Sequence, residues 1–380
     1  MRNTSVSGTG ITSLGDTQPA LRYLTGVDWG LLVSALLLAA VGLATVHSAS
    51  SELPVDYLPR QALWLGLGLA ALLVASSIDY HTLLDHSSLL YLCGLAGLVL
   101  VFFVGHEAGG AQSRLGFGGF SIQPSEFAKL ATAIALSRYL GELKQPYLDL
   151  RNIAIALAIV SLPVAAVAAE PDLGSAAMFL PMVAGMLLVA GIKWRTLVGA
   201  GVVALLLAAG VWSFGMQSYQ RQRVITFLSP DSDPLGAGYQ VRQSKIAVGS
   251  GGLVGQGYMQ GTQSQLRFLP ARHTDFIFAV LAEEWGFLGV MTVIALYALF
   301  LYCAARVALR ARNRAGILLV SGLVSLMAFH IVYNTAMVVG LVPITGIPLP
   351  FLSYGGSFTL MCFLATGMIL GVDLRRYVNR

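Results

Sequence analysis

The stretch FIFAVLAEEWGFLGVMTVIALYALFLYCA, residues 276–304, decides the fold class of this sequence. Its only charged side chains are Glu283 and Glu284. A helix needs ~20 mostly apolar residues to cross the hydrocarbon core of a bilayer, and this run is longer than that. It therefore predicts a transmembrane helix rather than a helix of a soluble core.

The rest of the chain repeats this pattern. Of its 380 residues 56% are hydrophobic and only 11% are charged, which excludes an ordinary soluble protein. Nine further apolar runs lie near residues 28–47, 61–78, 87–105, 123–140, 152–169, 174–191, 196–215, 315–339 and 355–373. The prediction is an all-α polytopic membrane protein with ten transmembrane helices.

Basic residues at the helix ends predict the orientation of the chain. The formal net charge of +5 does not indicate nucleic-acid binding, because the basic residues form no run with interleaved aromatic residues. In a ten-helix topology one side receives a large group of them: Lys144, Arg151, Lys193, Arg195, Arg306, Arg310, Arg312, Arg314, Arg375, Arg376 and Arg380. The positive-inside rule then makes both termini cytoplasmic.

We expect residues 1–27 to form a flexible cytoplasmic tail and residues 28–380 to form a single transmembrane domain. The tail lacks the features of a cleaved signal peptide. Cys93, Cys303 and Cys362 lie within predicted spans, so they indicate neither a disulfide framework nor a metal site.

A large extracytoplasmic loop, residues 216–275, separates the seventh and eighth predicted helices. It is rich in glycine, which permits close approach of the backbone to a ligand, but it also contains Ile, Val, Leu and aromatic residues. This composition favours a loop that folds onto the membrane surface. A flexible tether is the alternative.

The tract GLVPITGIPLPFLSYGGS, residues 340–357, is apolar and uncharged, yet its prolines and glycines forbid a regular helix. Lipid cannot satisfy the polar groups of non-helical backbone, so such backbone is tolerated at membrane depth only beside protein or a water-filled cavity. The tract predicts a re-entrant loop before the tenth helix. An ordinary turn at the membrane interface is the alternative.

Ionisable residues within the predicted spans are candidates for function, because each costs ~2.5 to 3.5 kcal/mol to insert. Glu126 and Lys129, in QPSEFAKLA, are three residues apart and share one helix face. They predict a buried ion pair. Its role is either functional or limited to pinning the fourth helix against its neighbours.

Asp275 lies at the start of the eighth helix, eight and nine residues before Glu283 and Glu284. This spacing corresponds to ~12 to 14 Å along a helix. Even inverting glycosidases hold their two carboxylates within ~9.5 Å, so the three acids do not form one acid/base pair. Asp275 is either a functional carboxylate or a simple helix cap.

Basic side chains of the large loop suit a phosphorylated ligand, because the planar fork of arginine matches phosphate oxygens. Attraction to anionic lipid headgroups is the alternative explanation. The basic residues of this loop are Arg221, Arg223, Arg242, Lys245, Arg267 and Arg272.

Several long motifs resemble the bacterial shape, elongation, division and sporulation (SEDS) family. They are YQRQRVITFL, DPLGAGYQVRQSKIAVGSGGLVGQGY, GTQSQLRFLPARHTDFIFAVLAEEWGFLG, GLVPITGIPLPFLSYGGS, QPSEFAKL and EPDLGSA. Together they extend over nearly the whole chain beyond the N-terminal tail, and the DPLGAGY to GTQSQLRFLP tract is most similar to the rod-shape branch of the family.

This resemblance implies a peptidoglycan glycosyltransferase that polymerises lipid II at the outer face of the bacterial cytoplasmic (inner) membrane, for cell elongation and rod shape. It implies that Asp275 is the essential acid and that Glu126 and Lys129 form a functional pair. It further implies a divalent cation, Mg or Mn, with unknown ligands. The implied partners are a class B penicillin-binding protein with transpeptidase activity and other membrane proteins of the elongation complex.

Two positions depart from the family pattern. Members usually have Arg-Trp before the fourth helix where this chain has Ser113 and Arg114, and a small residue usually follows SYGGS where this chain has Phe358. Whether Arg114 takes over the role of the family arginine is therefore open. Neither position touches the segment of Asp275.

We expect Asp275 to be the general base of an inverting transfer in which polyprenyl diphosphate leaves. The candidates for binding the diphosphate are Arg221, Arg223, Lys245, Arg272 and Arg114. Supporting roles are expected for Glu283, Glu284, His273, Ser353, Gly355 and Gly356. A flippase or transporter for the same lipid and a non-catalytic scaffold are the alternatives, since a buried ion pair and a broken apolar tract also occur in transporters.

Overall fold

The computed structural model describes residues 27–376 apart from 52, 54–55, 109–110, 118–119, 197, 200, 203–209, 211–217, 230–232 and 234–235. The tail expected at residues 1–27 lies outside the described residues except for its last position. Most of the span expected at 196–215 also lies outside them.

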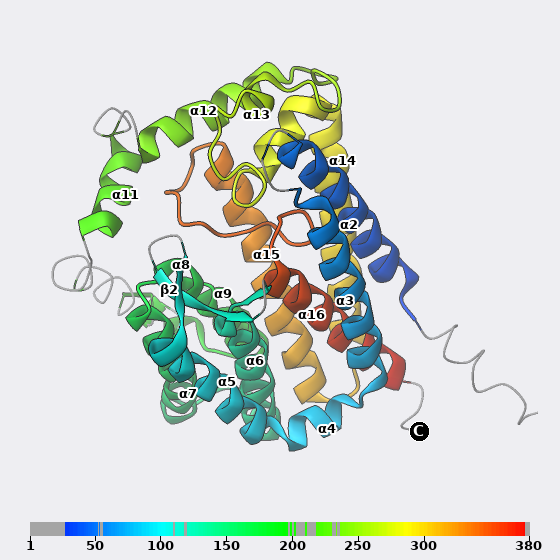
Figure 1. The fold of residues 1–380 in the computed structure, drawn as a ribbon. Coiled ribbons are helices and arrows are strands. Elements are labelled where there is room, and N and C mark those ends of the chain that lie inside the picture. The colour runs from blue at the N-terminus through cyan, green and yellow to red at the C-terminus, as the bar shows by residue number, and fades with distance from the viewer. Residues whose placement is uncertain are drawn as a thin grey trace, which may run out of the picture.

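Long helices make up most of the described chain (Figure 1). They are α2 (Trp29–Ser50), α3 (Leu58–Ser77), α5 (Ser87–Val104), α6 (Pro124–Glu142), α7 (Leu150–Ala169), α9 (Phe179–Ala190), α14 (Ile277–Arg310), α15 (Arg314–Val338) and α16 (Gly356–Arg375). The shorter helices are α4 (Tyr80–Asp85), α8 (Leu173–Ala177), α11 (Ser218–Leu228), α12 (Ala237–Ser250) and α13 (Thr262–Gln265).

Eight helical segments are long and apolar enough to cross a membrane, with α8 and α9 counted together as one. The predicted span at 123–140 corresponds to α6, which is not among the eight. Every 18-residue window of α6 contains Glu126, Lys129 and Arg138, and these charges lower its apolar character. The described residues thus support a multi-pass membrane protein, and the count of ten helices stays a prediction.

Two groups of helices meet at α15. One group contains α5, α6, α7 and α9, and the other contains α2, α3, α14 and α16 (Figure 1). Within the second group, α16 packs on α3 and α14 packs on α2. Because α15 contacts α6 and α9 on one side and α14 and α16 on the other, it joins the two halves of the molecule.

The large loop forms a roof over one end of the helices. In Figure 1 α11 and α12 arch above the rest of the chain, and α12 packs against α14. The loop is therefore folded rather than a tether in its described part. Its docking is fixed where the Ser244 hydroxyl donates to the Val338 carbonyl at the end of α15, over 2.7 Å.

A break in α14 receives the glycine-rich part of this loop. Gly286 has φ 65° and ψ −163°, which are not helical values. At this break Gln256 N donates to Glu283 O over 3.0 Å, and Phe287 N donates to Gly252 O over 2.9 Å. The loop backbone thus replaces hydrogen bonds that the helix gives up at its kink.

The segment between α15 and α16, residues 339–355, contains no helix, and beyond residue 343 it is buried or half-buried apart from Gly346. Its apolar side chains are inserted into the core: Ile344, Ile347, Leu349, Phe351 and Leu352 are all at most 7% exposed. This non-helical path agrees with the prediction for residues 340–357, although α16 already begins at Gly356. The depth of the segment in a bilayer stays a prediction.

The expectation of an all-α chain is wrong in one place. A small antiparallel sheet, with strands β1 (His106–Ala108), β2 (Ala111–Phe117) and β3 (Phe120–Ile122), lies between α5 and α6. A Gly-Gly pair separates each strand from the next in the sequence, a pattern that favours hairpin turns. The sheet carries Arg114 on β2.

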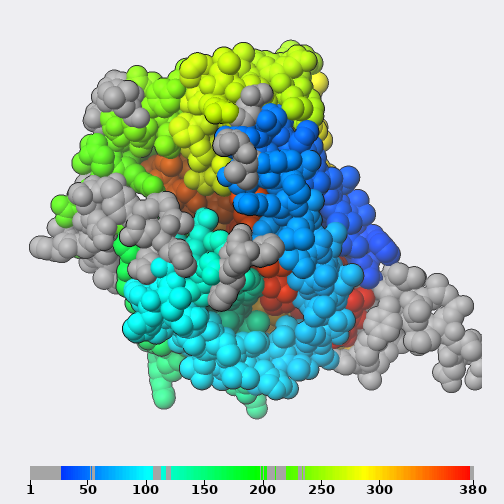
Figure 2. Space-filling view, in the orientation of Figure 1, coloured from blue at the N-terminus to red at the C-terminus, as the bar shows by residue number. Residues whose placement is uncertain are grey.

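A hollow opens on the face shown in Figure 2. The yellow-green atoms of α12 and α13 lie above it, the cyan atoms of the α5 and β2 region lie below it, and the blue atoms of α2 and α3 form its right side. Orange atoms, which belong to the chain around the end of α15 and the segment after it, form its rear wall. The 339–355 segment is therefore within reach of a ligand from this side.

We predict that Gly286→Ala destabilises the protein by at least about 2 kcal/mol, because the left-handed backbone is strained for alanine. A Cβ at this position would also lie 2.2 Å from the Gly255 nitrogen. The apparent Tm in detergent measures the effect. Gly66→Ala is the matched control, since a Cβ there meets nothing within 4 Å and alanine favours helix. Equal melting of the Gly286 variant and wild type would contradict the role of the kink.

Candidate active site

Asp275 lies in a tight turn just before α14. The carbonyl of Ala271 accepts hydrogen bonds from the backbone nitrogens of Thr274, Asp275 and Phe276, over 3.1 to 3.3 Å. The N-cap residue of α14 is Phe276, and no side chain caps this helix. The interpretation of Asp275 as a simple helix cap is therefore wrong, and its carboxylate is directed elsewhere.

The carboxyl group of Asp275 occupies a recess with unusual electrostatics. The residue remains partly exposed, but surrounding protein displaces enough water for burial to raise the pKa of Asp275 from 3.8 to about 6. Positive charges on Arg223 and Arg114 and the neighbouring Thr274 hydroxyl act in the opposite direction. Near neutral pH the group is thus mostly ionised, yet close to the range in which a general base is effective.

Three separate elements supply this site. Asp275 precedes α14, Arg223 lies on α11 of the roof, and Arg114 lies on β2 of the small sheet. Of the sequence candidates for diphosphate binding, these two arginines are the ones whose charges act on Asp275. Positive charges from two different elements thus act on one carboxylate.

The other basic candidates lie in different surroundings. Lys245 is next to the end of α15, where a Cβ on Gly340 would lie 2.7 Å from its Nζ. Arg272 is 3% exposed, and after burial its charge is the second cause that lowers the pKa of His273. Arg221 is two residues before Arg223 on α11, so the two side chains leave the helix on different faces. The charges of these three are not among the causes that shift the pKa of Asp275.

The 339–355 segment borders the carboxylate directly. Gly346 has φ 74°, and a Cβ there would lie 3.5 Å from Oδ2 of Asp275. The Ser353 hydroxyl accepts from Leu349 N over 2.8 Å and donates to Thr274 O over 2.7 Å. Ser353 therefore ties this segment to the turn of Asp275, in line with the supporting role that the sequence predicts for it.

An aromatic cluster lies beside the site and was missed from the sequence. Tyr57 stacks on His273 with ring centroids 4.7 Å apart, and Tyr354 packs edge-on against Tyr57 at the same distance. Arg60, on the first turn of α3, hydrogen-bonds to Tyr354. An arginine on the predicted outer side of the membrane was the available signal, because it departs from the positive-inside pattern.

Gly355 and Gly356 begin α16 in close contact with α3. A Cβ on Gly356 would lie 2.1 Å from the indole of Trp64, so only glycine fits there. The Ser357 hydroxyl, in the first turn of α16, accepts from Gln123 N over 2.9 Å and so ties the start of α16 to the start of α6. Gly356 thus acts on the packing of helices around the site, whereas a Cβ on Gly355 would meet only Phe358 Cβ at 3.7 Å.

Glu126 and Lys129 form the predicted buried pair. Their side chains are 4% and 1% exposed, and Nζ of Lys129 donates to Oε1 of Glu126 over 2.9 Å. The pair lies on α6 and faces α15 and α16, where its charges act on His330 and Cys362. It is a separate feature from Asp275, since neither residue contributes to the electrostatics of that carboxyl.

The hydrogen bonds of Glu283 and Glu284 stabilise the large loop rather than the site of Asp275. Glu283, fully buried, accepts from Gln263 N over 2.7 Å and from Ser264 N over 3.1 Å at the start of α13. Glu284, 1% exposed, accepts from the Ser48 hydroxyl of α2. Both adjacent acids therefore anchor the glycine-rich loop to α2 and α14.

Another buried acid, Glu170, lies in the turn after α7. Glu170 is 2% exposed, and burial, followed by the negative charge of Asp172, raises its pKa from 4.5 to about 8. Asp172 itself caps α8 by accepting from Ser175 N over 3.0 Å. At neutral pH Glu170 is therefore mostly protonated in the folded protein.

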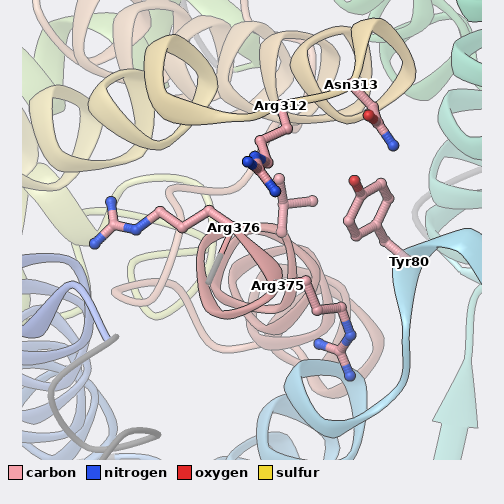
Figure 3. A pocket seen from close by; sticks show the side chains of 6 residues that line it. Tyr80, Arg312, Asn313, Arg375 and Arg376 are labelled. Atoms are coloured by element: carbon pink, nitrogen blue, oxygen red, sulfur yellow. The ribbon is translucent and has the colours of Figure 1, made fainter. Parts of the chain in front are cut away.

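A basic pocket lies at the far end of α14, away from Asp275. Its volume is about 180 Å3, and Tyr80, Arg312, Asn313, Val372, Arg375 and Arg376 line it. Figure 3 shows the Arg312 side chain between the end of α16 and the α14–α15 turn, whereas Arg375 and Arg376 extend in different directions. Arg375 donates to Ser76 O over 2.9 Å and Arg376 pairs with Asp373 over 2.8 Å, so these two are already used to hold helix ends together.

The chain is similar to a defined group of known proteins. A family described as cell cycle protein, of the FtsW, RodA and SpoVE type, matches residues 28–377. The peptidoglycan glycosyltransferase MrdB of Escherichia coli strain K12 is 38% identical over 353 residues, which cover 92% of this chain and 94% of that protein. The peptidoglycan glycosyltransferase RodA of Treponema pallidum is 33% identical and covers 94% of this chain and 99% of its own length.

Solved structures show the same fold. One chain of a peptidoglycan synthase complex, whose report concerns the coordination of polymerization and crosslinking, is 34% identical and matches with a TM-score of 0.81. The crystal structure of the rod shape determining protein RodA of Thermus thermophilus is 30% identical and matches with a TM-score of 0.69. Each match covers 92% of this chain and 98% of the other.

We predict that Glu170→Gln raises the apparent Tm by a few degrees at pH 8.5 and leaves it unchanged at pH 5. Because the folded pKa is about 8 and the ordinary value is 4.5, ionisation favours the unfolded chain as the pH rises between these two values. Glutamine keeps the neutral shape and removes this loss of stability.

The pH series of melting temperatures in one detergent checks this prediction. Glu142→Gln is the control, because the Glu142 side chain is 68% exposed and pairs only at the surface with Arg138. A wild-type melting temperature that does not fall relative to the Glu170 variant between pH 5 and 8.5 would contradict the assignment of a buried neutral acid.

Proposed function

This chain belongs to the FtsW, RodA and SpoVE family of cell cycle proteins, and from that membership we propose that it is a peptidoglycan glycosyltransferase. Its reaction is the polymerisation of lipid II into glycan strands for cell elongation and rod shape. The observation that carries the proposal is the carboxyl of Asp275, held in a recess where the charges of Arg223 and Arg114 act on it.

Asp275 acts as the general base of the transfer. Its carboxylate takes the proton of the acceptor sugar's 4-hydroxyl while that oxygen forms a bond to the anomeric carbon of the donor. The bond between the anomeric carbon and the diphosphate breaks, and its electron pair leaves with the phosphate oxygen. A single displacement inverts the anomeric centre, and a pKa near 6 suits a base that works around neutral pH.

Arg223 and Arg114 stabilise the departing diphosphate. Guanidinium groups form paired hydrogen bonds with phosphate oxygens, and preorganised cations act most strongly where charge develops in the transition state. This choice narrows the sequence prediction, because Arg221, Lys245 and Arg272 have other surroundings. On this proposal Arg114 takes over the role of the arginine in the family's usual Arg-Trp pair.

The hollow in Figure 2 accommodates the headgroup of lipid II while the prenyl chain stays in the membrane. The 339–355 segment and the glycine-rich loop form its walls. Gly346 lies beside the carboxylate of Asp275 with a left-handed backbone, so the wall can approach the reacting sugars closely. The aromatic rings of Tyr57 and Tyr354 pack next to His273, two residues before Asp275, and suit packing against a sugar face.

The Glu126–Lys129 pair serves the same function from within the bundle. A buried pair that loses one partner leaves an uncompensated charge, which is strongly destabilising. The pair faces His330 on α15, the helix that carries the 339–355 segment at its end. Its role is to fix α6 against α15 and so to hold the base of the hollow.

A divalent cation remains part of the proposal without a defined site. Within the described ranges, no group of three or more His, Cys, Asp or Glu side chains could hold a metal ion. These residues therefore do not fit a cation cage built from protein side chains alone. No step of the transfer is assigned to the cation.

The location and partners follow from the family. The eight apolar segments support a multi-pass protein of the bacterial cytoplasmic membrane, with both termini in the cytoplasm and Asp275 facing outward. A class B penicillin-binding protein is the proposed transpeptidase partner, together with other membrane proteins of the elongation complex. The matching chain from a synthase complex that coordinates polymerization and crosslinking supports such a partner.

A lipid II flippase is the second candidate function, favoured by one observation, the buried charged pair Glu126 and Lys129. A non-catalytic scaffold is the third. Purified protein in detergent separates them, because a flippase has no substrate gradient to act on without a membrane and a scaffold forms no product. Glycan polymer made from lipid II under these conditions supports the polymerase.

We predict that Asp275→Asn lowers polymerisation by at least about 100-fold, since it removes the base and leaves the shape of the site. Wild-type activity is expected to rise with pH through about 6, where the carboxyl loses its proton. The measurement is glycan product from lipid II on a gel over a pH series. Asp149→Asn, at an exposed position, is the control and keeps full activity. Near wild-type turnover of the Asp275 variant would refute the base assignment.

We predict that Arg223→Ala and Arg114→Ala each slow polymerisation by about 10-fold or more, because each removes a cation from the leaving group. Each variant also loses a positive charge that lowers the pKa of Asp275, so the acid limb of the pH profile moves upward. Arg242→Ala, on the exposed side of α12, is the comparison variant. If both site arginines tolerate alanine as well as Arg242 does, the diphosphate is bound elsewhere.

A further inference from the structure

Three successive backbone carbonyls in front of α14 are each held by a different partner. The His273 carbonyl accepts from Tyr354 N over 2.9 Å, and the Thr274 carbonyl accepts from the Ser353 hydroxyl over 2.7 Å. The Asp275 carbonyl accepts from Nδ2 of Asn334 over 2.9 Å. The first two partners belong to the 339–355 segment, and the third lies on α15.

Asn334 makes a second bond that connects these parts. The same Nδ2 donates to the Ile347 carbonyl over 2.7 Å, so one amide group joins the turn of Asp275 to the segment that walls the hollow. One turn earlier on α15, Nδ1 of His330 lies 3.2 Å from the Pro348 carbonyl. Asn334 is fully buried and His330 is 1% exposed, so little water can compete for the donors of these two side chains.

We propose that Asn334 is a positioning residue for catalysis: its side-chain amide fixes the backbone of Asp275 against the 339–355 segment and thereby aims the carboxylate. This inference rests on the proposed function, because it assumes that Asp275 is the base. Asn334 does not touch substrate and acts only through Asp275.

The chemistry of this position favours an amide. An NH2 group offers two donors at a fixed angle, and here the group donates to carbonyl oxygens of two different segments. A hydroxyl has one donor and cannot serve both carbonyls. Loss of the amide leaves the carbonyls of Asp275 and Ile347 without this donor, which costs free energy of folding. The turn of Asp275 can reduce this cost by moving.

The expected movement has a direction. The groups that face the Asp275 carboxyl are Arg114 from β2, Arg223 from α11 and Thr274 from its own turn, while the sequence of residues 340–355 carries no charge. Tyr333 of α15 and His273 are the nearby titratable groups. A turn released from α15 would let the carboxylate leave its recess and regain water, which lowers its pKa toward the ordinary value.

Two uncharged substitutions test the proposal in the full-length protein. Asn334→Leu keeps the branching and the number of side-chain heavy atoms without donors, and Asn334→Ser keeps one donor on a shorter side chain. Thr335→Val is the matched control, since its hydroxyl bonds only to Ile331 O and Val332 O within α15. The measurements are kcat and KM for lipid II polymerisation over pH 4.5 to 8, together with the apparent Tm.

We expect kcat of both Asn334 variants to fall by about 10- to 100-fold, because small displacements of a catalytic group have effects of this size. KM is expected to change by less than about threefold, since Asn334 does not touch substrate. The acid limb of the pH profile moves to lower pH, which a general loss of folded protein would not produce. Thr335→Val keeps the wild-type rate and profile.

Other outcomes overturn the inference. Full turnover of the Asn334 variants would show that the bond does not aim the base, and a lower rate with an unmoved acid limb would show a role in packing alone. If the leucine variant does not fold, the serine variant decides by the same two readouts. Asp275→Asn separates the two levels: if it is active, the proposed function fails, whereas an inactive Asp275 variant beside fully active Asn334 variants refutes only this inference.

Discussion

Backbone that is not helical needs hydrogen-bond partners when it is enclosed in a membrane protein, and this requirement shapes the whole centre of the molecule. The 339–355 segment meets it with donors and acceptors from three sources: Asn334 and His330 on α15, Ser353 within the segment, and the turn before α14. Satisfying this segment brings α15, α14 and the turn of Asp275 into one fixed arrangement. The hydrogen bonds that satisfy the backbone of this segment therefore also hold the turn of the proposed catalytic carboxylate.

Much of the fold could be predicted from the sequence because the hydrocarbon core imposes a length and a composition on each span. The runs near 276–304 and 315–339 match α14 and α15 closely. The break at Gly286 could not be predicted in the same way, because a glycine within an apolar run indicates neither a kink nor its partner. Likewise, the sheet before α6 consists of short hairpins. Their alternation of apolar and polar residues is a weaker signal than the apolar helical runs on either side.

The sequence proposed the acid of the candidate site and only part of its surroundings. The position of Asp275 at the start of a span fitted either a functional carboxylate or a helix cap, and the family resemblance selected the first. The Glu126–Lys129 pair was recognisable from its spacing, and the structure contains it. The partners of Asp275 come from α11 and β2, which are far apart in the sequence, so spacing carries no information about their meeting. Arg223 and Arg221 are alike in sequence, and only the direction in which each leaves its helix separates them.

The incomplete enclosure of Asp275 matters once the reaction repeats. After each transfer on the proposed mechanism, the carboxyl carries a proton, and among the described residues no second acid contributes to its electrostatics. The strand can be extended again only when that proton has escaped to bulk water, and the exposed edge of the residue gives it a route. A perfectly dry recess would stall after a single sugar linkage, so the small opening is what makes continuous synthesis compatible with a solitary base.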